Sequence, residues 1–193
     1  MFARYLAVIG FILGLCASIY SGVVQSGQTE INLVSPVPNL FVLDQNGNQV
    51  DFYRDLIKNK TVAINFIFTA CTSSCPLSTA IFKQVQKKLG KQKVQLITIS
   101  VDPANDTPER LLAFSKKFNA APGWEFIAGE RQVISGLLKN IGVYTTNRND
   151  HSNVVIVGND VNQQWTRLYG FPQADEIISA LQNVSAKNKS KNK

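Results

Sequence analysis

The chain has 193 residues, of which 45% are hydrophobic and 17% charged, and its formal net charge is +7. These fractions are typical of a globular domain, and the residues between an apolar N-terminal segment and a basic tail, about 150, suffice for one domain with its own core. Basic residues are not interleaved with aromatic ones, so the charge does not indicate nucleic-acid binding.

Residues 1–24 are predicted to be a membrane anchor or a signal segment. Residues 5–24 contain no charged side chain, and about 20 apolar residues in a helix can span a bilayer. Tyr20 interrupts the small-residue pattern of a cleavage site, which favours an uncleaved anchor over a secretory signal. Arg4 precedes the segment and the next basic residue is Arg54. We therefore expect inner-membrane anchoring with the domain in the periplasm, or an exported periplasmic domain if the segment is cleaved.

Cys16 lies inside this segment and is interpreted as a small apolar membrane residue. Two cysteines, Cys71 and Cys75, are then left for the exported domain, where they can cycle to a disulfide. Residues 187–193 form a lysine-rich tail that is predicted to be disordered and solvated, with attraction to anionic lipid as the alternative.

Residues 25–38 are polar and contain prolines, which predicts a linker to a domain at residues 39–186. Inside the domain, Asn46-Gly47 lies between two short apolar runs, a pattern that predicts a β-hairpin over 41–43 and 49–52. The stretch 61–68 is nearly all apolar and rich in β-formers, which is typical of a central strand buried on both faces.

The next segments alternate between helix and strand signals. Pro76 fits the first position of a helix, and 94–101 is the next apolar strand. Thr107 followed by Pro108 predicts the cap and first residue of another helix. The remaining predicted elements are a strand at 125–128, a helix at 133–141, a hairpin of 154–157 with 165–169, and a helix at 175–184.

This order predicts an α/β fold in which helices flank a central mixed β-sheet. A dithiol on the loop between a central strand and the following helix fits a thioredoxin-like arrangement. In that fold the loop before the late hairpin lies beside the dithiol. We therefore expect His151, the only histidine, next to Cys71 and Cys75.

Cys71 and Cys75 have three residues between them and are followed by Pro76, so both sulfurs can face one metal ion or join each other. We expect Cys75 near a helix N-terminus, where N–H groups lower the pKa of a thiol. Thiolates select Cu(I), and imidazole accepts both copper states. This ligand set is too small for a closed structural zinc site.

Plainer interpretations of the same residues stay open. The two cysteines can form a stabilising disulfide, and His151 can be an ordinary loop histidine. Asp150 either orients the imidazole or serves as a turn residue.

Three motifs occur together: Phe-Thr-Ala-Cys-Thr-Ser-Ser-Cys-Pro at 68–76, Ser-Val-Asp-Pro at 100–103 with Asp-Thr-Pro-Glu at 106–109, and Asp-His-Ser at 150–152. In their order and spacing the chain resembles the Sco/SenC family of copper-binding assembly factors for cytochrome c oxidase, over about residues 38–184. It departs from the family pattern at Thr72, where many members have proline, and in the polar segment 144–149.

The resemblance implies a copper metallochaperone in which Cys71, Cys75 and His151 bind one copper ion. Oxidation to a Cys71–Cys75 disulfide would remove both thiolates and gate metal binding. The implied partners are a copper donor protein and cytochrome c oxidase subunit II, or another copper-site apoprotein. The second motif is expected to form a turn and a helix start, with Asp102 near the site.

Two alternatives to a metallochaperone remain open. A thiol-disulfide oxidoreductase that reduces partner cysteines, or a redox-signalling protein, needs the dithiol alone. The spacing is wider than that of common oxidoreductases, and His151 falls where thioredoxins carry a cis-proline, which favours the copper interpretation. The third interpretation is a peroxidase that uses Cys71.

Overall fold

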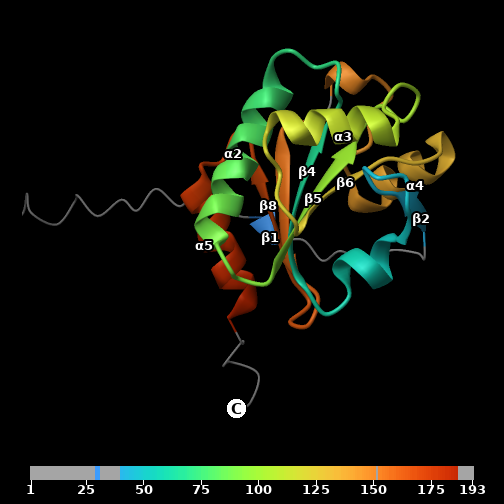
Figure 1. Ribbon diagram of the computed structural model, residues 1–193. Coiled ribbons are helices and arrows are strands. Elements are labelled where there is room, and N and C mark those ends of the chain that lie inside the picture. Colours follow the sequence, from blue (N-terminus) through green and yellow to red (C-terminus); the bar gives the residue numbers. More distant parts are fainter. Residues whose placement is uncertain (1–28, 31–39, 151, 187–193) are drawn as a thin grey trace, which may run out of the picture.

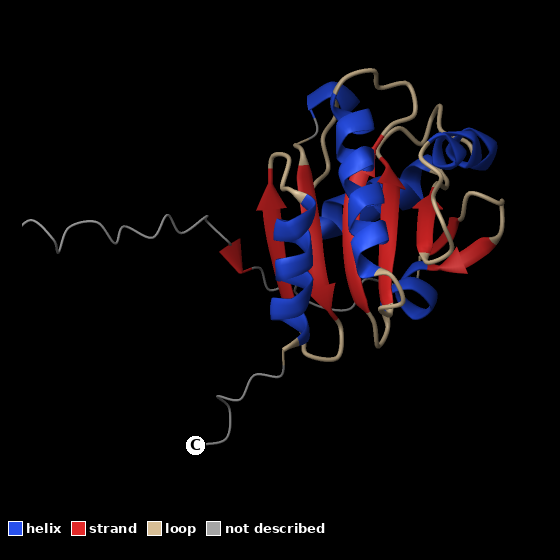
Figure 2. Cartoon of the chain, turned by 60° about the vertical axis from the view of Figure 1, so that its left-hand side comes forward, coloured by secondary structure: helices blue, strands red, loops and turns tan. Residues whose placement is uncertain are grey.

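The computed structural model describes residues 29–30, 40–150 and 152–186. Its centre is a six-stranded sheet with the order β1-β8-β7-β4-β5-β6 (Figures 1 and 2). The strands are β1 (Thr29–Glu30), β4 (Thr61–Ile67), β5 (Val94–Ser100), β6 (Trp124–Ile127), β7 (Val154–Asn159) and β8 (Gln164–Tyr169). β4, β5 and β6 run parallel, whereas β7 is antiparallel to both β4 and β8. The predicted mixed sheet is therefore confirmed.

Within the described residues, four α-helices flank this sheet: α2 (Ser74–Leu89), α3 (Pro108–Lys117), α4 (Arg131–Ile141) and α5 (Ala174–Ser185). Side chains of α2, α3 and α5 share one hydrophobic core, and those of α4 belong to a second. Figure 1 shows α2 and α5 side by side, with α4 on the other side of the sheet. The helices therefore cover both faces, as the alternating sequence pattern predicted.

β4 is buried on both faces because its apolar side chains alternate between the two cores. Ala63 and Ile67 pack into the core of α2, α3 and α5. Val62, Ile64 and Phe66 pack into the core that includes α4. The end of β4 is thereby held rigidly at the point where the chain enters the cysteine loop.

A small hairpin and a π-helix cover the α4 side of the sheet. They are β2 (Phe41–Leu43), β3 (Gln49–Asp51) and the π-helix η1 (Phe52–Ile57). The hairpin turn has Gly47 at a φ of 81°, the left-handed region that glycine adopts without strain. Asp51 caps η1, since its carboxylate accepts a hydrogen bond from the backbone N–H of Arg54. The hairpin was predicted from the sequence, whereas η1 was not.

The helix starts test two predictions directly. Thr107 caps α3 by accepting from the backbone N–H of Arg110, and Pro108 is the first helical residue, as predicted. α2 begins at Ser74, so Pro76 is its third residue. The prediction that Pro76 opens this helix was wrong, because Ser74 and Cys75 before it already belong to the first helical turn.

The predicted membrane segment at 5–24, the tail at 187–193 and His151 lie outside the described residues. Within the ranges that the structure covers, no helix has both the length and the apolar character needed to cross a bilayer. Inside the range predicted as a linker, β1 pairs antiparallel with β8, a strand that the sequence analysis did not predict.

Candidate metal centre

The two predicted sulfur ligands lie together where β4 passes into α2. Cys71 is in the loop before the helix and Cys75 is the second helical residue. Both are free thiols and are buried, with 8% and 1% of their surface exposed. The backbone N–H of Cys75 donates to Cys71 Sγ at 3.4 Å, and Ser74 Oγ lies 3.6 Å from the same sulfur. The first turn of α2 is therefore directed at the sulfur of Cys71.

The two thiols differ in acidity. Burial acts to raise the pKa of Cys71, but hydrogen bonds from the Cys75 thiol, the Cys75 and Ser73 backbone N–H groups and the Ser74 hydroxyl outweigh it and lower this pKa to about 6. Burial raises the pKa of Cys75 to about 12, and the neighbouring Cys71 sulfur adds to that rise. Cys71 is therefore the thiolate at neutral pH.

This assignment corrects the sequence analysis, which expected the lowered pKa at Cys75. The expectation assumed that the helix begins after Cys75. Because α2 begins at Ser74, the N–H groups of its first turn point back to Cys71, and Cys75 is enclosed in the core.

A chain of buried hydrogen bonds fixes α2 to the sheet next to the cysteines. Asn65 on β4 donates to Ser78 Oγ in α2 at 3.2 Å. Thr98 on β5 donates to Asn65 Oδ1 at 2.6 Å, and the indole N–H of Trp124 donates to Thr98 Oγ1 at 2.8 Å. Asn65 and Thr98 are fully buried. Satisfied buried polar groups of this kind fix the position of the helix that carries Cys75.

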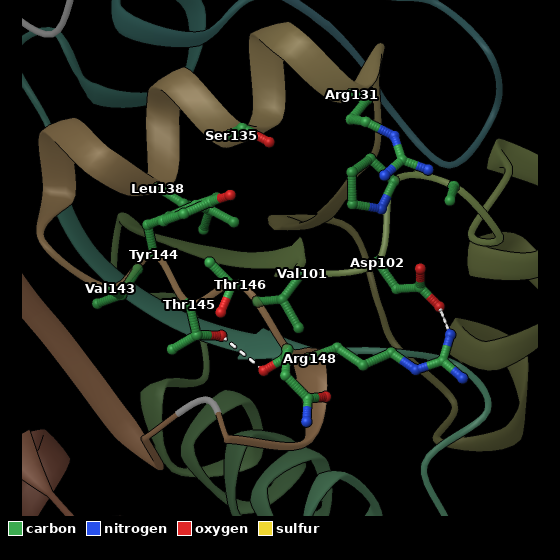
Figure 3. Close-up of a pocket in the computed structure, with 13 residues that line it drawn as sticks. Val101, Asp102, Arg131, Ser135, Leu138, Val143, Tyr144, Thr145, Thr146 and Arg148 are labelled. Carbon is green, nitrogen blue, oxygen red and sulfur yellow. Dashed lines mark hydrogen bonds and ion pairs between the residues drawn. The ribbon is translucent and has the colours of Figure 1, made fainter.

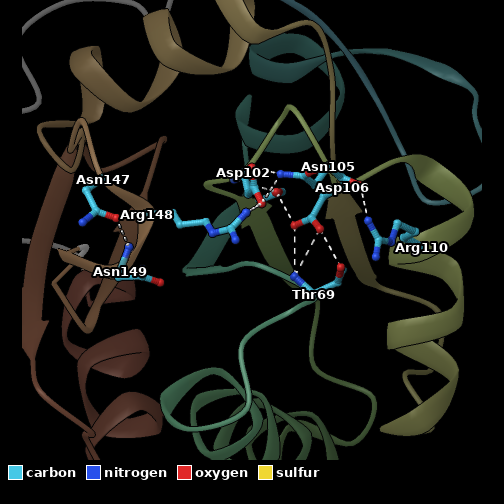
Figure 4. Close-up of polar contacts among 9 residues, drawn as sticks. Thr69, Asp102, Asn105, Asp106, Arg110, Asn147, Arg148 and Asn149 are labelled. Carbon is cyan, nitrogen blue, oxygen red and sulfur yellow. Dashed lines mark hydrogen bonds and ion pairs between the residues drawn. The ribbon is translucent and has the colours of Figure 1, made fainter.

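The second sequence motif forms a turn beside the cysteine loop (Figure 4). The buried carboxylate of Asp106 accepts from the Thr69 hydroxyl at 2.6 Å, from the Thr69 backbone N–H and from the Ser100 hydroxyl at 2.6 Å. Asp106 therefore holds the residues just before Cys71. In the sequence, Asp106 stands out only as part of a motif, and its place just before the Thr107 cap gives no signal of this contact.

Asp102, in the same turn, connects to the loop that leads to His151. Its carboxylate accepts from Asn105 at 2.9 Å and forms an ion pair with Arg148. The guanidinium of Arg148 also lies over the ring of Phe68, 5.2 Å from its centroid. Asp102 is thus linked through Arg148 to Phe68, three residues before Cys71, and Arg148 is a contact that sequence reasoning missed.

A hollow of about 370 Å³ lies beside this ion pair (Figure 3). Val101, Asp102 and Arg148 border it on one side, and Arg131 and Tyr144 are also among its lining residues. It runs along the polar segment that the sequence analysis noted as unusual for the resembled family. This hollow makes the surface beside the Asp102–Arg148 ion pair concave and polar.

The predicted third ligand, His151, lies outside the described residues. The 3₁₀-helix η2 (Arg148–Asp150) comes directly before it. The backbone N–H of Asp150 donates to the carbonyl of Asn147 at 3.0 Å, which agrees with the interpretation of Asp150 as a turn residue. Among residues 29–30, 40–150 and 152–186, no group of three or more His, Cys, Asp or Glu side chains is placed to hold a metal ion.

Comparison with known proteins decides the family. The SCO1/SenC family model matches residues 34–186. The chain belongs to the SCO1/SenC family. The predicted family and its thioredoxin-like fold are thereby confirmed.

The relatives agree with this result. A SCO1 protein homolog of Bacillus subtilis (strain 168) is 35% identical over 92 residues, which is 46% of this chain and 47% of the relative. The chain thus matches about half the length of that relative.

Two solved Sco structures share the fold. BsSco, a member of the Sco family of cytochrome c oxidase assembly proteins in which a disulfide switch was identified, superposes with a TM-score of 0.67 at 26% identity, covering 83% of this chain and 98% of BsSco. Bradyrhizobium japonicum ScoI, solved with copper bound, gives a TM-score of 0.63 at 26% identity, covering 75% and 96%.

Proposed function

We propose that this SCO1/SenC protein is a metallochaperone that carries one copper ion on Cys71, Cys75 and His151. The observation that carries the proposal is the pair of free, buried thiols around the first turn of α2. Thiolates are soft ligands that select Cu(I) over most competing metals. The donor set therefore fits copper, and the ScoI relative with copper bound supports the same cargo.

The unequal acidity of the thiols supports easy loading. Cys71 is already a thiolate at neutral pH, so it can bind copper without losing a proton. Cys75 must release its proton when the metal arrives, since metal binding and deprotonation are coupled. The third ligand, His151, follows in sequence a loop whose residue Arg148 contacts Phe68 and Asp102.

Redox chemistry of the same pair would gate copper binding. The Cys71 thiolate can attack one sulfur of a partner disulfide, and Cys75 then displaces the partner, leaving a Cys71–Cys75 disulfide and a reduced partner dithiol. Two electrons pass to the partner in this exchange. The oxidised form lacks both thiolates and so cannot hold Cu(I).

The remaining parts of the proposal concern place and partners. The apolar segment at 5–24 would anchor the chain in the inner membrane, with the domain in the periplasm, unless the segment is cleaved. The acceptor would be the copper site of cytochrome c oxidase subunit II or of another apoprotein, and a donor protein would supply the metal. The description of BsSco as a member of a family of oxidase assembly proteins supports this direction.

Copper content in the two redox states tests the proposal. The full chain is reduced, loaded with Cu(I), washed with a competing chelator and analysed for metal, in parallel with a sample oxidised beforehand. We expect about one copper per reduced chain, almost none per oxidised chain and almost none in Cys71→Ser. Cys16→Ser is the matched control and should bind as the wild type. Equal copper in reduced and oxidised chains would refute the thiolate site.

One observation favours a second candidate, a thiol-disulfide oxidoreductase. A nucleophilic Cys71 with a low pKa next to a buried Cys75 with a high pKa is the arrangement of an attacking and a resolving cysteine. This activity would reduce partner disulfides without copper. Turnover of a partner disulfide that is unchanged in His151→Ala and absent in Cys71→Ser would favour the oxidoreductase.

A further inference from the structure

The loop that precedes His151 is attached to the rest of the domain at both ends by arginine side chains. We define residues 142–150 as the approach loop. At its start, Arg167 on β8 donates to the carbonyls of Ile141 and Gly142, which end α4. At its other end, Arg148 reaches Asp102 and Phe68.

The contacts of Arg148 join three separate parts of the site. Asp102 belongs to the turn after β5, and its side chain is only 8% exposed. Phe68 lies three residues before Cys71 and is itself buried. A partly buried ion pair combined with a cation over an aromatic face is stronger than an exposed salt bridge, because water screens it less.

We propose that Arg148 is a positioning residue that fixes the approach loop against the cysteine loop and the Asp102 turn. The inference rests on the proposed function, since its purpose is to hold the residue that follows the loop, His151, ready for copper. Arg148 does not touch the metal in this account. Its effect passes through the loop backbone, in the way that groups outside a metal's ligand set orient the ligands.

The chemistry of the contact requires arginine. A planar guanidinium can pair with a carboxylate and lie flat on a ring at once, whereas a lysine ammonium cannot do both. Arg148→Lys should therefore keep the charge and lose most of the fixation. Arg131 offers a matched control, because it lines the same hollow from α4 and none of the described contacts of the approach loop involve it.

The first arm of the test needs no copper. Amide hydrogen exchange is measured on the reduced, metal-free full chain in wild type, Arg148→Ala, Arg148→Lys and Arg131→Ala. We expect peptides that cover 145–153 to exchange about tenfold faster in Arg148→Ala, almost as fast in Arg148→Lys, and at the wild-type rate in Arg131→Ala. Exchange in α2 and β4 should not change, which also shows that the variants fold. Wild-type exchange in Arg148→Ala would overturn the inference.

The second arm measures copper affinity in a double-mutant cycle. We expect Arg148→Ala to weaken copper binding about tenfold in the wild-type chain and to have no further effect in a His151→Ala background, because the arginine acts through that histidine. If Arg148→Ala binds like the wild type while His151→Ala is weakened, the inference fails and the proposed function stands. If His151→Ala binds copper fully, the proposed function fails, and with it the purpose assigned to Arg148.

Discussion

The sharpest local prediction concerns which cysteine reacts. At a pKa of about 6, Cys71 is about 90% thiolate at pH 7, whereas Cys75, at about 12, is thiolate in about one chain in 100,000. An ordinary cysteine with a pKa of about 8.5 is about 3% thiolate at this pH. The thiolate fraction of Cys71 is thus about 30-fold higher than usual.

The rate of alkylation alone does not reveal this difference. The intrinsic nucleophilicity of a thiolate falls as its pKa falls. The pKa of Cys71 lies about 2.5 below the ordinary value, and with a Brønsted slope of about 0.5 this difference lowers the nucleophilicity of the Cys71 thiolate nearly 20-fold. The two effects nearly cancel at pH 7. The pH at which the rate is half-maximal is the diagnostic quantity, because it reports the pKa itself.

The assay uses the reduced, metal-free chain with Cys16→Ser, so that only Cys71 and Cys75 react. Iodoacetamide is added between pH 4.5 and 9, and peptide mass spectrometry follows each site. We expect Cys71 modification to rise with pH to a plateau with a midpoint near 6, and Cys75 modification to stay far slower throughout. Cys75→Ala removes the thiol donor, the largest of the interactions that lower the Cys71 pKa, while the backbone N–H of residue 75 stays, and it should move the midpoint upward. A Cys71 midpoint between 8 and 9, or equal modification of both thiols, would refute the reasoning.

Three further predictions concern stability. Asp106→Asn should lower the free energy of unfolding by about 2–3 kcal/mol, measured by urea denaturation, because the carboxylate accepts several buried hydrogen bonds; an unchanged midpoint would contradict its role. Gly158→Ala should destabilise the fold by more than about 2 kcal/mol, since a Cβ would lie 1.9 Å from the Trp165 ring. As the matched control, a Cβ at Gly136 in α4 meets nothing within 4 Å, so Gly136→Ala should stabilise the fold by about 0.5–1 kcal/mol. The pKa of Cys71 is lower in the folded chain than in the unfolded chain, so its thiolate stabilises the fold above the unfolded pKa, near 9, and this stabilisation is lost as the pH falls toward 6. In thermal melts, the stability advantage of the reduced chain over Cys71→Ser should therefore shrink as the pH is lowered from 9 to 6. A constant difference would contradict the lowered pKa.

Much of the fold could be predicted because its signals are local. The apolar run of β4 and the Thr107-Pro108 pair at the start of α3 depend on a few neighbouring residues, and both predictions were confirmed. The π-helix η1 was missed, although Asp51 caps it in the way that acidic residues cap helices. β1 was missed because a two-residue strand carries too short a pattern to recognise.

The site was only partly predictable, because its contacts are long-range. The position of the dithiol where β4 passes into α2 followed from strand and helix patterns, but the choice of Cys71 as the thiolate depends on where α2 starts and how deeply Cys75 is buried. The contacts of Asp106 with Thr69 and of Arg148 with Asp102 span 37 and 46 residues of sequence. No spacing rule connects such pairs before the sheet is assembled.

A copper titration of the reduced full chain, compared with His151→Ala, tests the central claim most directly. The Cu(II) form is followed by its thiolate charge-transfer absorption and by nitrogen hyperfine coupling in electron paramagnetic resonance. We predict one copper per wild-type chain with one coupled nitrogen, and a weaker complex without that coupling in His151→Ala. An identical affinity and spectrum in the two proteins would contradict a two-thiolate, one-imidazole copper carrier.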